Sequence, residues 1–247
     1  MELKGISIGF TDCDEEVARD FNRWYDTDHV PENIALPEIV TARRYVQTPD
    51  LVATRGAQAL PEFQDGVGRY IATYLLGVDD FDTVERKMKG LFDDLLKVRR
   101  IFRRARVTYS DKFRLIKAYP GESVPVGPEA VPYLGHDAIM VALTDVPDHS
   151  RRAEVEQWWD EVHIPDMVAV PGMLGAMRLE SVVPDRDRRV MFMFLVEGEP
   201  ADLAPRMREH SQRWAEQGRV YKQDERPHRS LYNGYYRLIT PFKYDFL

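Results

Sequence analysis

The chain has 247 residues, 44% of them hydrophobic, and a formal net charge of −7. This length fits one large domain or two ordinary ones, and the composition is globular rather than disordered. The acidic balance argues against a nucleic-acid partner, and the single cysteine, Cys13, excludes an internal disulfide and a cysteine-based metal cluster. With no apolar run that could span a bilayer and no signal-peptide pattern, we expect a cytoplasmic protein without a membrane partner.

Hydrophobic periodicity predicts alternating strands and helices in the first half of the chain. In order, these are a strand at 5–11, a helix at 15–29, strands at 39–47 and 68–78, a helix at 81–97 and a strand at 107–119. Because proline lacks a backbone donor, Pro31 should end or kink the first helix near His29. A loop-like stretch of about 20 residues at 48–67 separates the second and third strands, and a loop of that length is often functional.

A segment rich in proline and glycine, 119–135, separates this half from the next. The same order then recurs, with strands at 137–145, 174–183, 189–197 and 231–242 and helices at 151–163 and 201–217. The order β-α-β-β-α-β is that of the split-βαβ or ferredoxin-like unit. We therefore predict one repeat at 1–118, a linker at 119–135 and a second repeat at 136–247.

An eight-residue motif occurs once in each repeat. Residues 24–31 read Trp-Tyr-Asp-Thr-Asp-His-Val-Pro, and residues 158–165 read Trp-Trp-Asp-Glu-Val-His-Ile-Pro, 134 positions later. Continuing at this offset to Arg44 and Arg178 gives eight identities in 21 positions. The chain is therefore a tandem duplication.

The repeated motif, followed by proline and then Ala-x-Arg, resembles the dimeric α/β-barrel superfamily, and within it the EthD-like and NIPSNAP-like proteins. The resemblance covers 3–118 and 136–243. It implies an α+β fold in which two tandem ferredoxin-like units pair into an intrachain dimeric α/β barrel. Glu38 departs from the pattern, since the second repeat has Gly172 at that point. The superfamily includes polyketide cyclases, cofactor-free monooxygenases, muconolactone-isomerase-type enzymes and haem-dependent enzymes.

The motif carries the residues of an acid–base site. Asp26 and His29 are three positions apart, as are Asp160 and His163, and positions three or four apart share one face of an α-helix. A carboxylate beside an imidazole fixes its tautomer, and a position at a helix C-terminus would raise the histidine pKa. The aromatic residue four positions before each histidine, Tyr25 or Trp159, would form a wall of an apolar pocket. We expect these four acid–base residues to be catalytic and the two aromatic residues to bind substrate.

A structural interpretation of the same residues stays open. His29 and His163 could cap their own helices by bonding the last free carbonyl groups. Trp24 and Trp158, five positions before the histidines, would then belong to the core. The strand residues Arg44 and Arg178 could pair with the motif aspartates or meet an anionic substrate, and we also expect them to contact the substrate.

The two sites differ in their neighbours. Glu32 and Asn33 lie near His29, so the first site is more polar, and we count both residues as substrate contacts. We assign the long loop 48–67 to this site. The second site is rich in methionine, which adapts to ligand shape. Our hypothesis is that the first site performs the chemistry and the second binds or only packs.

The leading expectation is a cofactor-independent lyase, dehydratase, cyclase or isomerase that acts on a small hydrophobic molecule, aromatic or polyketide-like, without a metal. An oxidative alternative is a cofactor-free monooxygenase or a haem enzyme. Haem is the main alternative cofactor, and the candidate axial ligands are His29, His163, His210 and His228. The third possibility is a non-enzymatic binding or stress-response module. Further assembly of these pseudo-dimeric chains into a homo-oligomer is left open.

Overall fold

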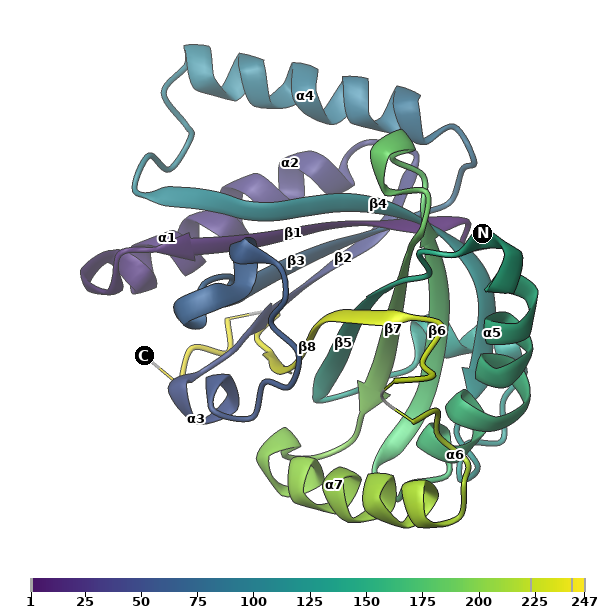
Figure 1. Ribbon diagram of the computed structural model, residues 1–247. Coiled ribbons are helices and arrows are strands. Elements are labelled where there is room, and N and C mark those ends of the chain that lie inside the picture. The colour runs from purple at the N-terminus through teal and green to yellow at the C-terminus, as the bar shows by residue number, and fades with distance from the viewer. Residues whose placement is uncertain (1, 223, 241, 247) are drawn as a thin grey trace.

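A computed structural model describes residues 2–222, 224–240 and 242–246 of the chain. The strands of this part form one closed antiparallel barrel (Figure 1). They are β1 (Gly5–Cys13), β2 (Ile39–Val46), β3 (Tyr70–Leu76), β4 (Ala105–Pro120), β5 (Ala138–Asp145), β6 (Met173–Ser181), β7 (Arg189–Val196) and β8 (Arg229–Leu238). Their order around the barrel is β1-β3-β2-β8-β5-β7-β6-β4.

This order shows two ferredoxin-like units joined at two seams. Within each repeat the first strand lies between the fourth and the third, and the second strand follows the third. The fourth strand of each repeat pairs with the second strand of the other, β4 with β6 and β8 with β2. The predicted α+β fold, with tandem units that pair within one chain, is confirmed.

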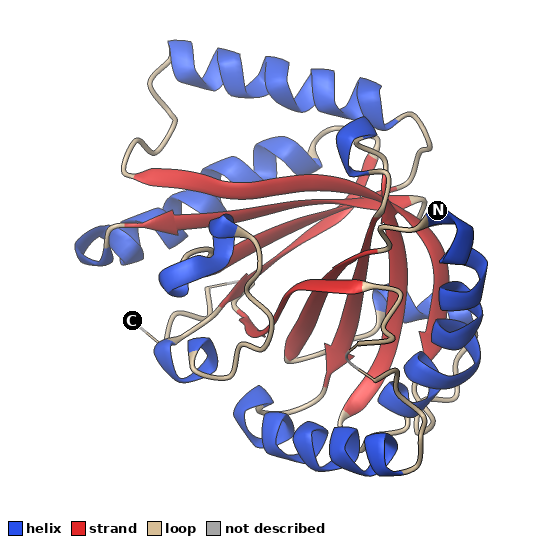
Figure 2. Cartoon of the chain, viewed as in Figure 1, coloured by secondary structure: helices blue, strands red, loops and turns tan. Residues whose placement is uncertain are grey.

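The helices lie on the outside of the sheet (Figure 2). They are α1 (Ala18–Trp24), α2 (Val30–Ile34), α3 (Pro49–Val52), α4 (Phe81–Lys97), α5 (Arg152–Trp158), α6 (Ile164–Val168) and α7 (Pro200–Glu216). Each long helix begins at an acidic cap, which satisfies an otherwise unpaired backbone N–H. The Asp80 carboxylate accepts from the Thr83 N–H at 2.9 Å, and Glu199 accepts from the Ala201 N–H at 3.1 Å.

Side chains fill the inside of the barrel. Alternate residues of β1, namely Ile6, Ile8 and Phe10, are at most 1% exposed and belong to a core cluster built from both repeats. Two further clusters lie between the sheet and the helices, each built mainly from one repeat, with Leu51 joining the repeat-2 cluster and Ile239 the repeat-1 cluster. Because the barrel interior is packed, the two cavities considered below lie outside it, beneath α4 and α7.

The predicted linker has structure of its own. Strand β4 runs to Pro120, and a short 3₁₀ helix occupies Pro128–Tyr133. Since one sheet joins both repeats, a division of the chain at 119–135 stays a proposal.

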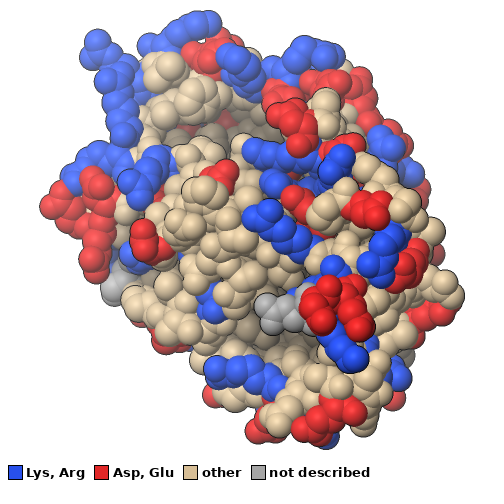
Figure 3. Space-filling model, in the orientation of Figure 1, with Lys and Arg blue, Asp and Glu red and all other residues tan. Residues whose placement is uncertain are grey.

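None of the helices in the described ranges is long and apolar enough to cross a membrane. Basic and acidic side chains are interspersed over the face seen in Figure 3.

Candidate functional site

Both copies of the motif form a π-helical turn, at Tyr25–His29 between α1 and α2 and at Trp159–His163 between α5 and α6. The i to i+5 hydrogen bonds of such a turn bring residues five positions apart onto one face. Trp24 therefore stacks on His29, with ring centroids 4.9 Å apart, and Trp158 stacks on His163 at 4.7 Å. Each motif tryptophan lies on the same face as its histidine, which regular α-helical spacing does not predict.

The sequence predicts an end or a kink of the first helix near His29. The regular α geometry is interrupted by the π turn at Tyr25–His29, but the helix does not end there. It continues as α2, with Pro31 in the first turn of that segment, as far as Ile34. The wider π turn makes room for the proline ring, which would otherwise clash with the carbonyl group four residues earlier. The histidines are therefore not at helix C-termini, and neither the expected capping nor the expected rise in pKa occurs. Burial instead lowers the pKa of His29 to about 4.

The expected pairing of Asp26 with His29 is also absent. The Asp26 carboxylate accepts a hydrogen bond from Arg44 Nη1 at 2.8 Å, and the two side chains are 3% and 1% exposed. Arg44 Nη2 donates to Asn22 Oδ1 at 2.6 Å, and the Tyr244 hydroxyl donates to the other Asp26 oxygen. Asp26 and Arg44 therefore form a buried ion pair. This contact agrees with the structural interpretation, in which Arg44 pairs with the motif aspartate.

The equivalent pair in the second repeat is looser. Asp160 accepts from the Tyr119 hydroxyl and from Lys117 Nζ at 2.9 Å, while Arg178 Nε lies 3.5 Å away. The Asp160 side chain is 24% exposed. Like Asp26, it has no hydrogen bond to the histidine of its motif among the described residues, so His163 is not oriented by this carboxylate.

The expected substrate-binding residues divide into two groups. Tyr25 lies in the core beneath the Arg44 guanidinium, 4.3 Å from ring centroid to Cζ, and Glu32 pairs with Arg100 on the surface at 2.6 Å. Trp159 and Asn33, in contrast, each line a cavity. Among all the expected substrate-binding residues, Trp159 and Asn33 are therefore the ones that a ligand could reach.

Each repeat has one cavity between its second long helix and the outer face of its sheet. The repeat-1 cavity, of about 580 Å³, lies under α4 and includes His29 and Asn33. The repeat-2 cavity, of about 660 Å³, lies under α7 and includes Trp159 and His163. Both volumes fall in the range of small-molecule sites.

Each cavity is also walled by the other repeat. Residues 53–56, from the long loop of repeat 1, line the repeat-2 cavity. Residues 182–184 and Arg186, from the short turn of repeat 2, line the repeat-1 cavity. The expectation that loop 48–67 serves the first site is therefore wrong, because this loop crosses the β2–β8 seam. Its residue Ala59 donates to the Leu231 carbonyl at 2.8 Å.

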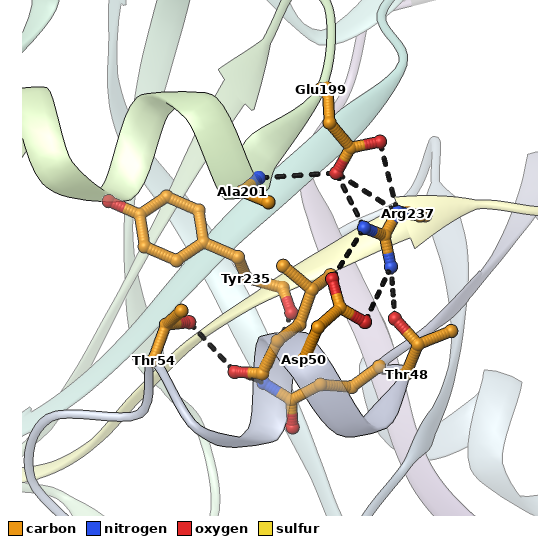
Figure 4. Close-up of polar contacts among 9 residues, drawn as sticks. Thr48, Asp50, Thr54, Glu199, Ala201, Tyr235 and Arg237 are labelled. Atoms are coloured by element: carbon orange, nitrogen blue, oxygen red, sulfur yellow. Dashed lines mark hydrogen bonds and ion pairs between the residues drawn. The ribbon is translucent and has the colours of Figure 1, made fainter.

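An ion-pair network connects this loop to the start of α7, the helix that covers the repeat-2 cavity (Figure 4). Arg237 of β8 binds Asp50 at 2.7 Å on the loop side and Glu199 at 2.6 Å at the start of α7. Glu199 in turn caps α7, as described above. The hydrogen bond from Arg237 holds the pKa of Asp50 at about 2. The network therefore couples the position of loop 48–67 to that of α7.

Two histidines face the repeat-2 cavity. His163 and His228 both stack on Trp158, with centroids 4.7 and 5.3 Å from the indole. Burial lowers the pKa of each to about 4, so both imidazoles are neutral at pH 7. His228 Nδ1 is buried without a hydrogen-bond partner among the described residues. His210, on α7, packs on Trp214 instead and does not line this cavity.

Sequence reasoning missed His136, which lies in the predicted second repeat just before β5. Its Nε2 is 3.0 Å from the Tyr45 hydroxyl and its Nδ1 is 2.9 Å from the Leu134 carbonyl oxygen. Burial lowers its pKa to about 4. His136 occurs once and has no counterpart in the first repeat, so the internal repeat could not reveal it.

Comparison with known proteins supports the fold. No family model and no curated protein matches the sequence. A proposed monooxygenase from Fusobacterium nucleatum matches with a TM-score of 0.55 and 8% identity, covering 97% of this chain and 94% of its own. A proposed chlorite dismutase matches at 0.54 and 12% identity, covering 96% and 95%. A variant of DypB from Rhodococcus jostii in complex with haem matches at 0.51 and 9% identity, covering 96% and 93%.

These matches correct two expectations. The predicted cofactor-independent lyase, dehydratase, cyclase or isomerase reaction is wrong, because the similar structures are named as a proposed monooxygenase, a proposed chlorite dismutase and, from Mycobacterium smegmatis, a DyP-type peroxidase. The expectation of no cofactor is wrong as well, because a similar structure is a complex with haem. The dimeric α/β-barrel fold is the part of the resemblance that the comparison shows.

Proposed function

We propose that the chain is a haem-dependent oxidative enzyme whose haem lies in the repeat-2 cavity. The observation that carries this proposal is the pair of neutral imidazoles, His163 and His228, that face an apolar cavity of about 660 Å³. A neutral imidazole is the form that ligates iron. The haem complex of the similar DypB structure supports the same choice of cofactor. The narrower EthD-like or NIPSNAP-like resemblance rests on the repeated motif alone.

The lining of this cavity fits a flat apolar group with acidic substituents. Its walls include the buried side chains of Met140, Phe192, Phe194 and Met207. The lining also contains Arg208 and Arg226, both exposed and without an ion pair among the described residues. Guanidinium groups in this position would pair with carboxylates such as the propionates of haem.

His163 is the residue that would hold the iron, because it lies on a rigid helical turn and its ring is fixed against Trp158. When bound, haem supplies one-electron and oxygen chemistry that no side chain provides. His228 would remain a neutral hydrogen-bonding group beside it. Residues 53–56, held by the Arg237 network, would shield the site from water.

Haemin titration of the purified full-length chain tests the proposal. The wild type should develop a Soret band that saturates at one equivalent of haemin. His163→Ala should weaken haemin binding at least about tenfold, because the iron would lose its protein ligand. Added imidazole should restore the band in this variant. His149→Ala is the matched control, because its side chain is 52% exposed and lies outside the cavity. A wild type that binds no haemin, or a His163→Ala variant that binds it normally, would refute the assignment.

A further inference from the structure

The repeat-1 cavity is not used by the proposed haem chemistry, yet its volume of about 580 Å³ is close to that of the repeat-2 cavity. It exists because the outer face of β1 carries small residues. Ser7 lines the cavity. Gly9 lies on the same face of β1 and pairs with the lining residue Ser110 of β4, and a Cβ added at Gly9 would meet no atom within 4 Å. The matching positions of β5 are Met140 and Ala142.

Polar groups without partners gather on its lining. His29 Nδ1 is buried and has no hydrogen-bond partner in the described part of the chain. The half-buried Ser7 and the exposed Ser110 also line the cavity, and neither side-chain hydroxyl has a hydrogen-bond partner within those residues, so both can bind a ligand. Asn33 fixes the turn by donating to the His29 carbonyl at 2.7 Å. A buried polar atom without a partner is costly, so a hydrogen-bonding ligand would be favoured here.

The charges around this cavity are already compensated. Glu85 pairs with Lys112, Arg186 Nη1 lies 3.2 Å from Asp111, and Lys89 pairs with Asp93 at 2.7 Å. Asp82, which also lines the cavity, lies 4.0 Å from the Nζ of Lys112. The set therefore has no surplus positive charge for an anionic ligand, in contrast to the arginines of the repeat-2 cavity.

The remaining lining is apolar. Leu76, Val84, Met88 and Val182 contribute to it, and Phe92 of α4 is 42% exposed beside them. Such a surface would cover the carbon skeleton of a small ring-sized molecule, while the polar groups would bind its substituent.

We propose that the repeat-1 cavity is a second ligand site, separate from the haem site, for a neutral ring-sized molecule with one hydroxyl group. Its apolar body would lie between α4 and β1. Its hydroxyl would bind the neutral imidazole of His29 and the serine hydroxyls. The proposal does not depend on haem binding, because no residue is common to the linings of the two cavities.

Three probes and matched variants test this site by calorimetry on the full chain. We expect p-cresol to bind with one-to-one stoichiometry, and toluene and benzoate to bind at least about tenfold more weakly, a difference of about 1.4 kcal/mol. Ser7→Leu and Gly9→Leu, which fill the cavity from two positions, should each weaken p-cresol binding by a similar factor. Ala142→Leu, which fills the repeat-2 cavity, should leave it unchanged.

The proposal is overturned if p-cresol does not bind, if toluene or benzoate binds equally well, or if the folded repeat-1 variants bind p-cresol like the wild type. Loss of binding in Ala142→Leu alone would move the site to repeat 2 and also overturn it. Circular dichroism identifies the variants that fold. Because two positions are substituted separately, the test remains possible if one of the two variants does not fold. Repeating the titration with haemin present should give the same affinity, so failure of the haem proposal and of this one are distinguishable.

Discussion

Replacing Asp26 by alanine should lower the free energy of unfolding by about 3–5 kcal/mol, the cost of leaving a buried charge without its partner. Arg44 is 1% exposed and would keep its hydrogen bonds to Asn22, but its charge would lose the carboxylate 2.8 Å away. The bonds to Asp26 from Tyr244 and from the Phe242 N–H, which tie the C-terminal segment to repeat 1, would be lost as well.

The duplication provides a matched control in Asp160→Ala. Its carboxylate is 24% exposed and its partner Lys117 is 46% exposed, so water screens this pair. Partly exposed pairs of this kind contribute roughly 1 kcal/mol or less. The buried Arg178 would keep two other carboxylates, Glu156 at 3.6 Å and Glu180 at 3.7 Å. Thermal unfolding followed by circular dichroism should show a drop of about 10–15 °C for Asp26→Ala and a much smaller one for Asp160→Ala. Equal drops in the two variants would contradict the assignment of Asp26 and Arg44 as a buried structural pair.

Acidification from pH 7 to pH 4.5 should lower the Tm of the haem-free chain by roughly 10 °C. Four imidazoles have a pKa of about 4 in the folded protein, against an ordinary value of 6.5. They belong to His29, His136, His163 and His228. Between pH 6.5 and pH 4 these imidazoles are protonated in the unfolded chain but stay neutral in the folded chain. Stability is therefore complete above pH 6.5 and falls as the pH approaches 4.

A fully buried imidazole with these two pKa values would contribute roughly 2–3 kcal/mol at pH 4.5. Because the rings of His29, His163 and His228 are partly exposed to water, we expect roughly 1 kcal/mol from each imidazole, or about 4 kcal/mol in all. Tm measured at half-unit steps of pH gives the slope. The double variant His29→Gln/His136→Gln should show a shallower slope, because glutamine does not titrate. A Tm that stays constant, or rises, over this range would show that the histidines are not buried in the neutral form.

The fold could be predicted because its signals repeat. Apolar alternation and helical periodicity gave the element order, and the offset of 134 residues identified the two repeats. The candidate site was predicted only in part. His163 and Trp159 do line a cavity, but Asp26 and Asp160 bind arginine, tyrosine or lysine partners instead of histidine.

The reason for this error is the hydrogen-bond register of one turn. A period of 3.6 residues places Asp26 and His29 on one face, but the π turn shifts the face so that Trp24 meets His29. Pro31 predicted a discontinuity without indicating which kind. A second error concerned the long loop, because only the barrel closure shows that residues 53–56 reach the cavity of the other repeat.

We propose that the two cavities bind different ligands and that haem binds in repeat 2. The most direct test is haemin titration of two variants that fill equivalent positions, Ala142→Phe in the repeat-2 cavity and Gly9→Phe in the repeat-1 cavity. We predict that Ala142→Phe weakens the Soret-forming complex at least about tenfold, or 1.4 kcal/mol, and that Gly9→Phe leaves its affinity unchanged. Loss of haemin binding in Gly9→Phe with normal binding in Ala142→Phe would contradict the account.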